Sequence, residues 1–167
     1  PGVADSSASA GSSSGGYFSG QGDKLIKIRA SDTFGHQKTA GPFRFKTDFV
    51  KPVIVGDMFA LVGLTDFMGS SSSVSRLVIN VTETNELKKL SAFSDQIEFA
   101  VNEIDPATSC VLHHEESIGD YYTCTWTPIR VLPSASVSIQ FKIEDKVGNV
   151  LEQTLSKTFV VDTSAPE

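Results

Sequence analysis

The chain contains two cysteines, Cys110 and Cys124, which flank a short polar segment. Residues 110–114 and 121–126 are typical of the two arms of a β-hairpin, with residues 115–120 as its loop. A bond between the two sulfurs would close a loop of about 14 residues, worth roughly 3 kcal/mol in the chain-entropy estimate. We expect a disulfide, as in secreted proteins, and two buried thiols are the alternative. Two cysteines without further sulfur ligands make a poor metal site.

A second group with metal-binding residue types is His113-His114-Glu115-Glu116, in the same hairpin. Adjacent residues of a strand point to opposite faces, so the two histidines cannot chelate one ion together. The segment also lacks the second histidine of a zinc-protease helix. We therefore expect an exposed polar hairpin tip rather than a metal site.

Residues 11–15 (GSSSG) fit the G-x-S-x-G pattern of a nucleophilic serine. The pattern needs a strand before it and a helix after it to expose the serine, and a Ser/Gly tract supplies neither. The sequence shows no pair of general acid and base, no metal cluster and no phosphate-binding loop. We predict that the chain is not an enzyme.

One N-glycosylation sequon occurs, Asn80-Val81-Thr82, on or at the end of an expected strand. Glycosylation of Asn80 requires that its side chain point outward. Trp126 alternates with Tyr122 and Cys124, so the three share one face of a strand. A tryptophan beside a disulfide indicates core packing rather than a sugar-binding platform.

The elements that would position these residues are strands. Apolar and polar residues alternate in several short segments, which are rich in β-branched and aromatic residues and are separated by Gly, Pro, Asp and Ser. These segments are residues 24–29, 43–46, 74–81, 96–101, 137–143 and 158–161. Residues 83–93, with Leu87 and Leu90 three apart, are expected to form a short helix or an irregular loop. The pattern predicts an all-β chain with an antiparallel sandwich.

The composition restricts the possible partners. The net charge of −6 argues against a nucleic-acid binder, and no apolar run approaches the roughly 20 residues that span a bilayer. The segment 1–22 holds seven Ser and six Gly, which predicts a flexible leader. Residues 1–52 carry seven Lys/Arg against four Asp, a net charge of +3, whereas residues 53–167 carry seven against sixteen acids, a net charge of −9. Segments of opposite charge can attract each other within a chain or between copies.

An internal repeat relates residues 26–52 to residues 141–166. Both segments have an alternating strand, then Asp-x-x-Gly-(His/Asn), a polar stretch, a strand with Phe-x-x-Asp, and a proline. Phe45, Asp48 and Pro52 correspond in this alignment to Phe159, Asp162 and Pro166. The two copies are therefore separated by about 114 residues, the length of one immunoglobulin-like unit. This period predicts a Ser/Gly leader at 1–22, a partial β unit at 23–52 and a complete sandwich with an exit linker at 53–167.

The second copy of the repeat, with DKVGN and TFVVDTSAPE, resembles the end of bacterial and archaeal immunoglobulin-like repeat domains. Such domains occur in cell-surface adhesins, S-layer proteins and surface filaments. The matching residues are Asp145, Gly148, Asn149, Phe159, Asp162, Thr163, Ala165 and Pro166. The first copy matches at Asp32, Gly35, Asp48 and Pro52, with His36 in place of the asparagine.

The resemblance implies an immunoglobulin-like fold and an extracellular or cell-surface location. Such arrays sometimes bind calcium at domain junctions, and Asp48, Asp145 and Asp162 are the candidates here, with Asp57 and Glu167 near them. None belongs to a dense run of carboxylates, so Asp145 and Asp162 are instead expected to cap turns. No other cofactor is expected.

The function expected from these features is structural. Two or three strands cannot form a stable sandwich alone, so residues 23–52 should pair with an adjacent domain or with a neighbouring copy. Pairing between copies would build a filament, array or adhesin by strand addition. The alternatives are a glycan- or protein-binding module that uses the loops at 70–73 and 115–120, and an accessory domain of a larger secreted enzyme.

Overall fold

A computed structural model describes residues 21–63, 67–68, 73–117 and 119–161. The chain divides into two compact units, residues 1–50 and residues 51–167, and each is described here by itself. The predicted leader lies almost wholly outside the described residues, as does the serine pattern at 11–15. No helix in the described segments is long and apolar enough to cross a membrane.

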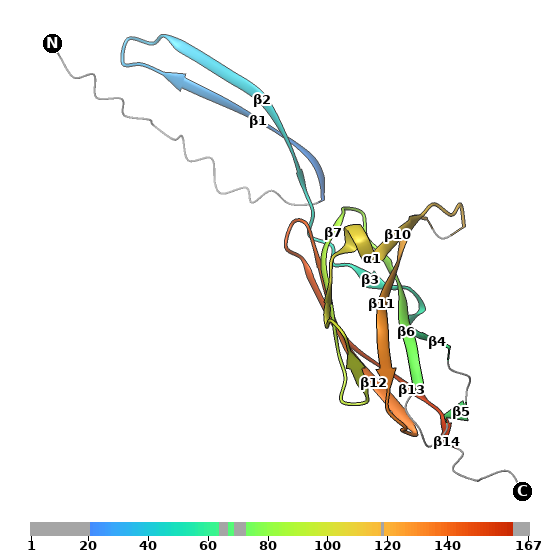
Figure 1. Cartoon of the computed structure of the whole chain (residues 1–167). Coiled ribbons are helices and arrows are strands. Elements are labelled where there is room, and N and C mark those ends of the chain that lie inside the picture. Colours follow the sequence, from blue (N-terminus) through green and yellow to red (C-terminus); the bar gives the residue numbers. More distant parts are fainter. Residues whose placement is uncertain (1–20, 64–66, 69–72, 118, 162–167) are drawn as a thin grey trace, which may run out of the picture. The chain divides into compact units, whose positions relative to one another are not determined.

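The first unit is a two-stranded antiparallel hairpin (Figure 1). It consists of β1 (Gly22–Ser31) and β2 (Gln37–Thr47). The ladder shifts by one residue between Ile26 and Ile28, opposite Gly41, so β2 carries a bulge there. Gly41 has φ of 102°, and a Cβ at this position would lie 2.7 Å from the carbonyl oxygen of Ile26, so the bulge requires glycine.

The second unit contains two larger sheets. The four-stranded sheet has the order β13–β12–β7–β9 and is antiparallel throughout. Its strands are β7 (Leu87–Phe93), β9 (Glu103–Ile104), β12 (Ser136–Asp145) and β13 (Val150–Thr158). The inward residues of β12 are completely buried, and they are Val137, Ile139, Phe141 and Ile143.

The six-stranded sheet has the order β10–β11–β6–β3, with β4 also paired to β6 and β8 also paired to β11. Its strands are β3 (Val53–Ile54), β4 (Ala60–Val62), β6 (Ser73–Thr82), β8 (Ile97–Phe99), β10 (Cys110–His113) and β11 (Tyr121–Val131). A 3-10 turn, η1, covers Val55–Asp57. The short strands β5 (Phe67–Met68) and β14 (Val160–Val161) pair in parallel.

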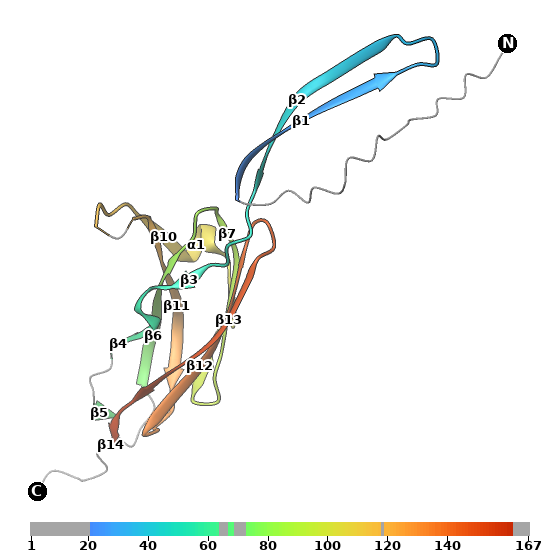
Figure 2. The same ribbon diagram turned by 180° about the vertical axis from the view of Figure 1, so that it is seen from behind.

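The two sheets of the second unit form the layers of a sandwich (Figures 1 and 2). Phe141 of β12 joins them, because its ring lies 6.0 Å from that of Trp126 of β11 and 6.3 Å from that of Phe59. Aromatic pairs at these separations add to the free energy gained by burying apolar area. The predicted all-β fold is confirmed: an antiparallel sandwich, consistent with an immunoglobulin-like fold, accompanies a partial β unit at the N-terminal end.

The expectation of a short helix or an irregular loop over residues 83–93 is wrong for Leu87–Phe93, which is strand β7. The ladder between β12 and β7 shifts between Glu144 and Asp145, which pair with Lys89 and Leu87. This bulge places Leu87 and Leu90 on the same inward face, so a spacing of three arises without a helix. The α-helix in the described residues is α1 (Pro106–Ser109), which Asp105 caps through the amide of Ala107.

The polar stretches that follow the two Asp-x-x-Gly turns are strands, which the sequence did not predict. They form the start of β2 and most of β13. Each lies at the edge of its sheet, where one side of the strand has no neighbour among the described strands. An edge strand needs backbone pairing on one side only, so it tolerates polar side chains that hide its strand pattern.

Candidate functional site

The turn that closes each hairpin has the same hydrogen bonds in both units. In the first unit, a carboxylate oxygen of Asp32 accepts from the amides of Phe34 and His36, each at 2.9 Å. In the second unit, Asp145 accepts from the amides of Val147 and Asn149, at 2.9 and 2.8 Å. The second carboxylate oxygen of each aspartate bonds the side chain of the residue four positions later, at 2.8 Å in both turns.

The glycines of the two turns also correspond. The amides of Gly35 and Gly148 donate to the carbonyls of Asp32 and Asp145, and their φ angles are 86° and 95°. These are left-handed conformations, which favour glycine. The turn-capping role expected of Asp145 is therefore present, and Asp32 has the same role.

The strand ladders match beyond the turns. Four successive pairs of β1–β2 run from Ser31↔Gln37 to Ile28↔Ala40. They correspond, with a constant difference in residue number, to the four pairs of β12–β13 from Glu144↔Val150 to Phe141↔Gln153. The Phe-x-x-Asp match, which aligns Phe45 with Phe159, does not follow the ladder. Phe45 pairs with Lys24, the counterpart of Val137, whose partner is Lys157 rather than Phe159.

The hairpin of the first unit has two chemically different faces. We call one the apolar face, and it carries Ile26, Ile28, Phe43 and Phe45, with Lys24 and Lys38 toward its two ends. We call the other the basic face, and it carries Lys27, Arg29, Arg44 and Lys46, together with Leu25 and Asp23. Residues that pair across an antiparallel ladder point to the same side, which is why the two sets separate. Residues 22–47 hold six Lys/Arg against two Asp.

The counterpart of the apolar face is buried in the second unit. Ile28 corresponds to Phe141, and Ile28 is 56% exposed whereas Phe141 is 0% exposed. Phe43 corresponds to Leu155 in the ladder, and the exposed fractions are 51% and 8%. The second unit covers this face with its six-stranded sheet, and β7 pairs with the edge of β12 that faces away from β13. The corresponding edge of β1, which we call the open edge, pairs with no strand that the structure describes.

The outward charges of the two hairpins also differ. In the second unit, Lys142 lies 2.7 Å from Glu152 across β12 and β13, and Lys88 of β7 lies 2.5 Å from Glu144. The Lys142 ammonium hydrogen-bonds the Glu152 carboxylate, which lowers the pKa of Glu152 and raises that of Lys142. In the described part of the first unit, no acidic side chain pairs with Lys27 or Arg29.

The carboxyl of Asp32 has a pKa below its ordinary value, first because the side chain of His36 hydrogen-bonds it and then because backbone amides do. Both groups are exposed, so solvent screens their interaction. The phenol of Tyr122 has a raised pKa, because partial burial and then the nearby carboxylates of Glu86 and Glu83 disfavour its anion.

The expected disulfide is present. Cys110 and Cys124 are directly opposite in β10 and β11, with their Cα atoms 4.1 Å apart. Trp126 shares the inward face with Cys124, is fully buried, and donates from its indole nitrogen to the carbonyl of Asn102 at 3.1 Å. The predicted core role of Trp126 is therefore confirmed.

The histidines of the β10–β11 hairpin do not form one group. His113 stacks on Tyr121 with ring centroids 5.0 Å apart, whereas Nδ1 of His114 lies 2.8 Å from a carboxylate oxygen of Asp120. Both interactions lie at the exposed tip. The side chain of Asn80 lies on the outer face of β6, is partly exposed, and accepts a hydrogen bond from Thr123 at 2.8 Å. Glycosylation of Asn80 stays a prediction.

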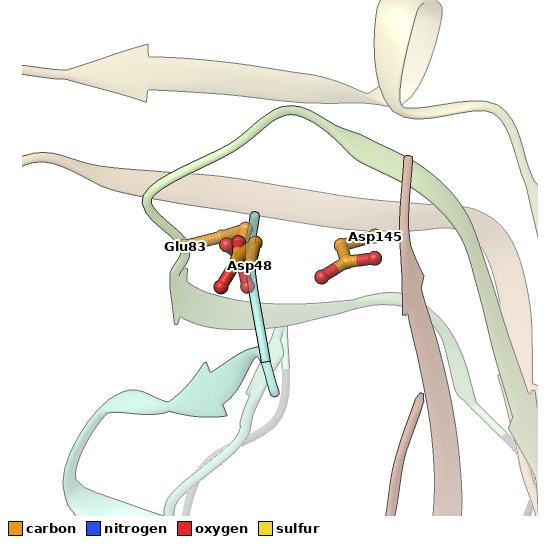
Figure 3. A group of neighbouring side chains, drawn as sticks. All are labelled: Asp48, Glu83 and Asp145. Carbon is orange, nitrogen blue, oxygen red and sulfur yellow. The ribbon is translucent and has the colours of Figure 1, made fainter. Parts of the chain in front are cut away.

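Of the calcium candidates, Asp48 and Asp145 lie within the described residues. Asp48 belongs to the unit that ends at Val50 and accepts from the amide of Val50 at 2.9 Å, and Asp162 lies outside the described residues. Figure 3 shows Asp145 near Glu83, which sequence reasoning missed, and one carboxylate oxygen of each lies within 4.8 Å of the other. Asp145 is fully buried and bonded within its own turn. Calcium binding stays a prediction.

The sequence matches no protein-family model, and no curated protein matches it. The resemblance to immunoglobulin-like surface repeats therefore depends on this chain's own residues. Within the chain, the correspondence of the two hairpins is the strongest functional observation, because it identifies a face and an edge that are covered in one unit and open in the other.

Proposed function

We propose that the chain is a non-enzymatic structural subunit of an extracellular filament, array or adhesin. Its units join through β contacts, in which a neighbouring unit covers the hairpin β1–β2. The observation that carries this proposal is the half-exposed apolar face of the hairpin, at positions whose counterparts in the second unit form its core. A two-stranded ribbon is at best marginally stable in water, so covering this face should stabilise it.

The disulfide and the turn chemistry support the same proposal. A disulfide persists in oxidising compartments, which favours an extracellular location. The repeated Asp-x-x-Gly turn indicates that the chain contains two versions of one building unit, as surface arrays do. A heterologous contact between units, with different surfaces on the two partners, generates an open polymer unless the rotation closes.

The proposal is tested by changing one face of the hairpin at a time. We expect Ile28→Asp with Phe43→Asp to abolish self-association of the full chain, because it places charges on the apolar face. Leu25→Asp is the matched control, since Leu25 is 58% exposed, close to the 56% of Ile28, but lies on the opposite face. Light scattering after size-exclusion chromatography and electron microscopy report assembly.

The wild-type chain and the Leu25→Asp variant should both form higher-order species as the concentration rises. The apolar-face variant should remain monomeric, with the fluorescence of its single tryptophan unchanged. A wild-type chain that stays monomeric at every concentration would show the proposed function to be wrong.

A further inference from the structure

The open edge of β1 has a defined counterpart in the second unit. Strand β12 has β13 on one side and β7 on the other, whereas β1 has only β2 among the described strands. The constant offset through the turn and the adjoining pairs identifies β1 with β12 and β2 with β13. A strand on the open edge would therefore occupy the place that β7 occupies beside β12.

The β12–β7 ladder supplies a register for that strand. Ala92 and Leu90 of β7 pair with Phe141 and Ile143, and all four side chains point into the core. In β1 the counterparts of Phe141 and Ile143 are Ile28 and Ala30, so two apolar residues of the added strand would lie opposite them. The second position has more room than its counterpart, because alanine stands where the second unit has isoleucine.

The charges on the outer side define the chemistry of the added strand. Ser91 and Phe93 pair with Lys142 and Gln140, whose counterparts on β1 are Arg29 and Lys27. In the second unit the cations of this surface have carboxylates across the ladder, such as Glu152 for Lys142 and Glu144 for Lys88. Residues 22–31 and 37–47 offer no such carboxylate to Lys27 or Arg29, so a matching strand should supply it.

We infer that the open edge of β1 binds an extended strand of a partner protein, antiparallel to β1, whose residues alternate between apolar side chains toward Ile28 and Ala30 and acidic side chains toward Lys27 and Arg29. This inference rests on the proposed function, in which a neighbouring unit covers the hairpin, and specifies the chemistry of the strand on its open edge. Backbone hydrogen bonds give such an addition its affinity, and the alternating side chains give it its register.

Two occupants from this protein itself fit less well. Residues 1–20 hold one carboxylate, Asp5, and no alternation of apolar and acidic residues. The outer edge of β13 in a second copy is long enough and also lacks a neighbour among the described strands. However, its outward residues Glu152, Thr154 and Ser156 include a single acid, and Lys142 already pairs with it.

The test uses the full chain and synthetic peptides with the sequence of residues 86–95. The acidic peptide carries Ser91→Glu and Phe93→Glu, and the basic peptide carries Ser91→Lys and Phe93→Lys, so the two differ only at the outward positions. A scrambled acidic peptide without alternation controls for attraction by charge alone. Binding is measured by titration, with backbone amide chemical shifts locating the peptide on β1 or elsewhere.

We expect the acidic peptide to shift the amides of residues 22–31 and to bind about tenfold more tightly than the basic peptide, since two cross-strand pairs change from attraction to repulsion. The protein variant Lys27→Glu with Arg29→Glu should reverse this preference. Both substitutions are on an exposed surface, so the variant should keep the tryptophan fluorescence of the wild type.

Several results would overturn the inference. They are equal binding of the scrambled peptide, no shift on β1 with either alternating peptide, and binding that appears only after residues 1–20 are deleted. A fourth is self-association of the chain that blocks binding of the acidic peptide to β1, which would assign the edge to a second copy. If the chain assembles but binds no peptide, the proposed function holds and the inferred strand site does not. If the peptide binds but the chain never assembles, only the strand site holds.

Discussion

The hairpin β1–β2 and the hairpin β12–β13 have the same turn and the same ladder next to it, yet one is exposed and the other is the centre of a core. Ile28 is 56% exposed, and its counterpart Phe141 is 0% exposed. Within these two hairpins, the local alternation of residues determines which side chains share a face. A second sheet buries that face in the hairpin β12–β13, and the same unit supplies this sheet.

The comparison separates two sources of stability. The turn and the ladder are local, and both hairpins have them. The packing of Phe141 against Trp126 and Phe59 is long-range, and only the second unit has it. Since most of the free energy that stabilises a sheet comes from packing a face, we expect the two hairpins to respond very differently to the same substitutions.

The largest difference should follow removal of the central apolar side chain. Phe141→Ala should lower the free energy of unfolding of the second unit by about 3–5 kcal/mol, because it leaves a cavity between the sheets. Ile28→Ala in the dilute chain should change it by less than about 0.5 kcal/mol, because the side chain is half-exposed. Urea unfolding followed by the fluorescence of Trp126 measures both, and similar losses for the two variants would contradict the comparison.

The next largest effect concerns the cross-link, which belongs to the second unit alone. Replacing Cys110 and Cys124 by serine should lower the free energy of unfolding by about 3 kcal/mol, because the loop between them is no longer closed in the unfolded chain. Amide exchange in β1 and β2 should stay as in the wild type. Adding a reductant to the wild-type chain should lower its free energy of unfolding by the same amount. An unchanged unfolding midpoint would argue against a stabilising disulfide.

The turn glycines should have a smaller effect. Gly148→Ala should destabilise the second unit by about 1 kcal/mol, since φ of 95° strains an alanine although no atom lies within 4 Å of its Cβ. Gly35→Ala carries the same strain but should leave the urea unfolding curve unchanged. Its effect should instead appear as faster amide exchange at the ends of β1 and β2. A shift of the urea midpoint by Gly35→Ala would mean that the hairpin contributes to the core.

The smallest effect is the pH dependence of the first turn. Hydrogen bonds to Asp32, first from the His36 side chain, lower the pKa of its carboxyl in the folded state below the ordinary value of 3.8. The stabilisation is therefore present above pH 3.8 and is lost as the pH falls through the lower folded pKa. The amide shifts of Phe34 and His36 should titrate below 3.8, and Asp32→Asn should remove the titration. A midpoint at or above the ordinary value would contradict this.

The sequence predicted the features that depend on neighbouring residues. Alternation identified several of the main strands, and the Asp-x-x-Gly pattern identified both turns, with the capping role expected of Asp145 but not of Asp32. The spacing around Cys110 and Cys124 identified the disulfide hairpin. Each of these signals is local, so it is visible before the chain folds.

The features that the sequence did not predict depend on distant partners. Leu87–Phe93 is a strand because β12 and β9 flank it. Its bulge interrupts the alternation of apolar and polar residues that indicates a strand. The polar strand β13 is specified by its pairing with β12 rather than by its own side chains. The proximity of Glu83 to Asp145 follows from the position of the loop after β6 beside the end of β12, which no spacing in the sequence reveals.

The central claim is that the hairpin β1–β2 is covered by a neighbouring unit, and amide hydrogen exchange of β1 against concentration tests it most directly. The account predicts that in dilute solution the β1 amides exchange much faster than those of β12, and that their protection rises toward that of β12 as the chain assembles. Strong protection of β1 in the dilute monomer, unchanged by concentration, would contradict the claim.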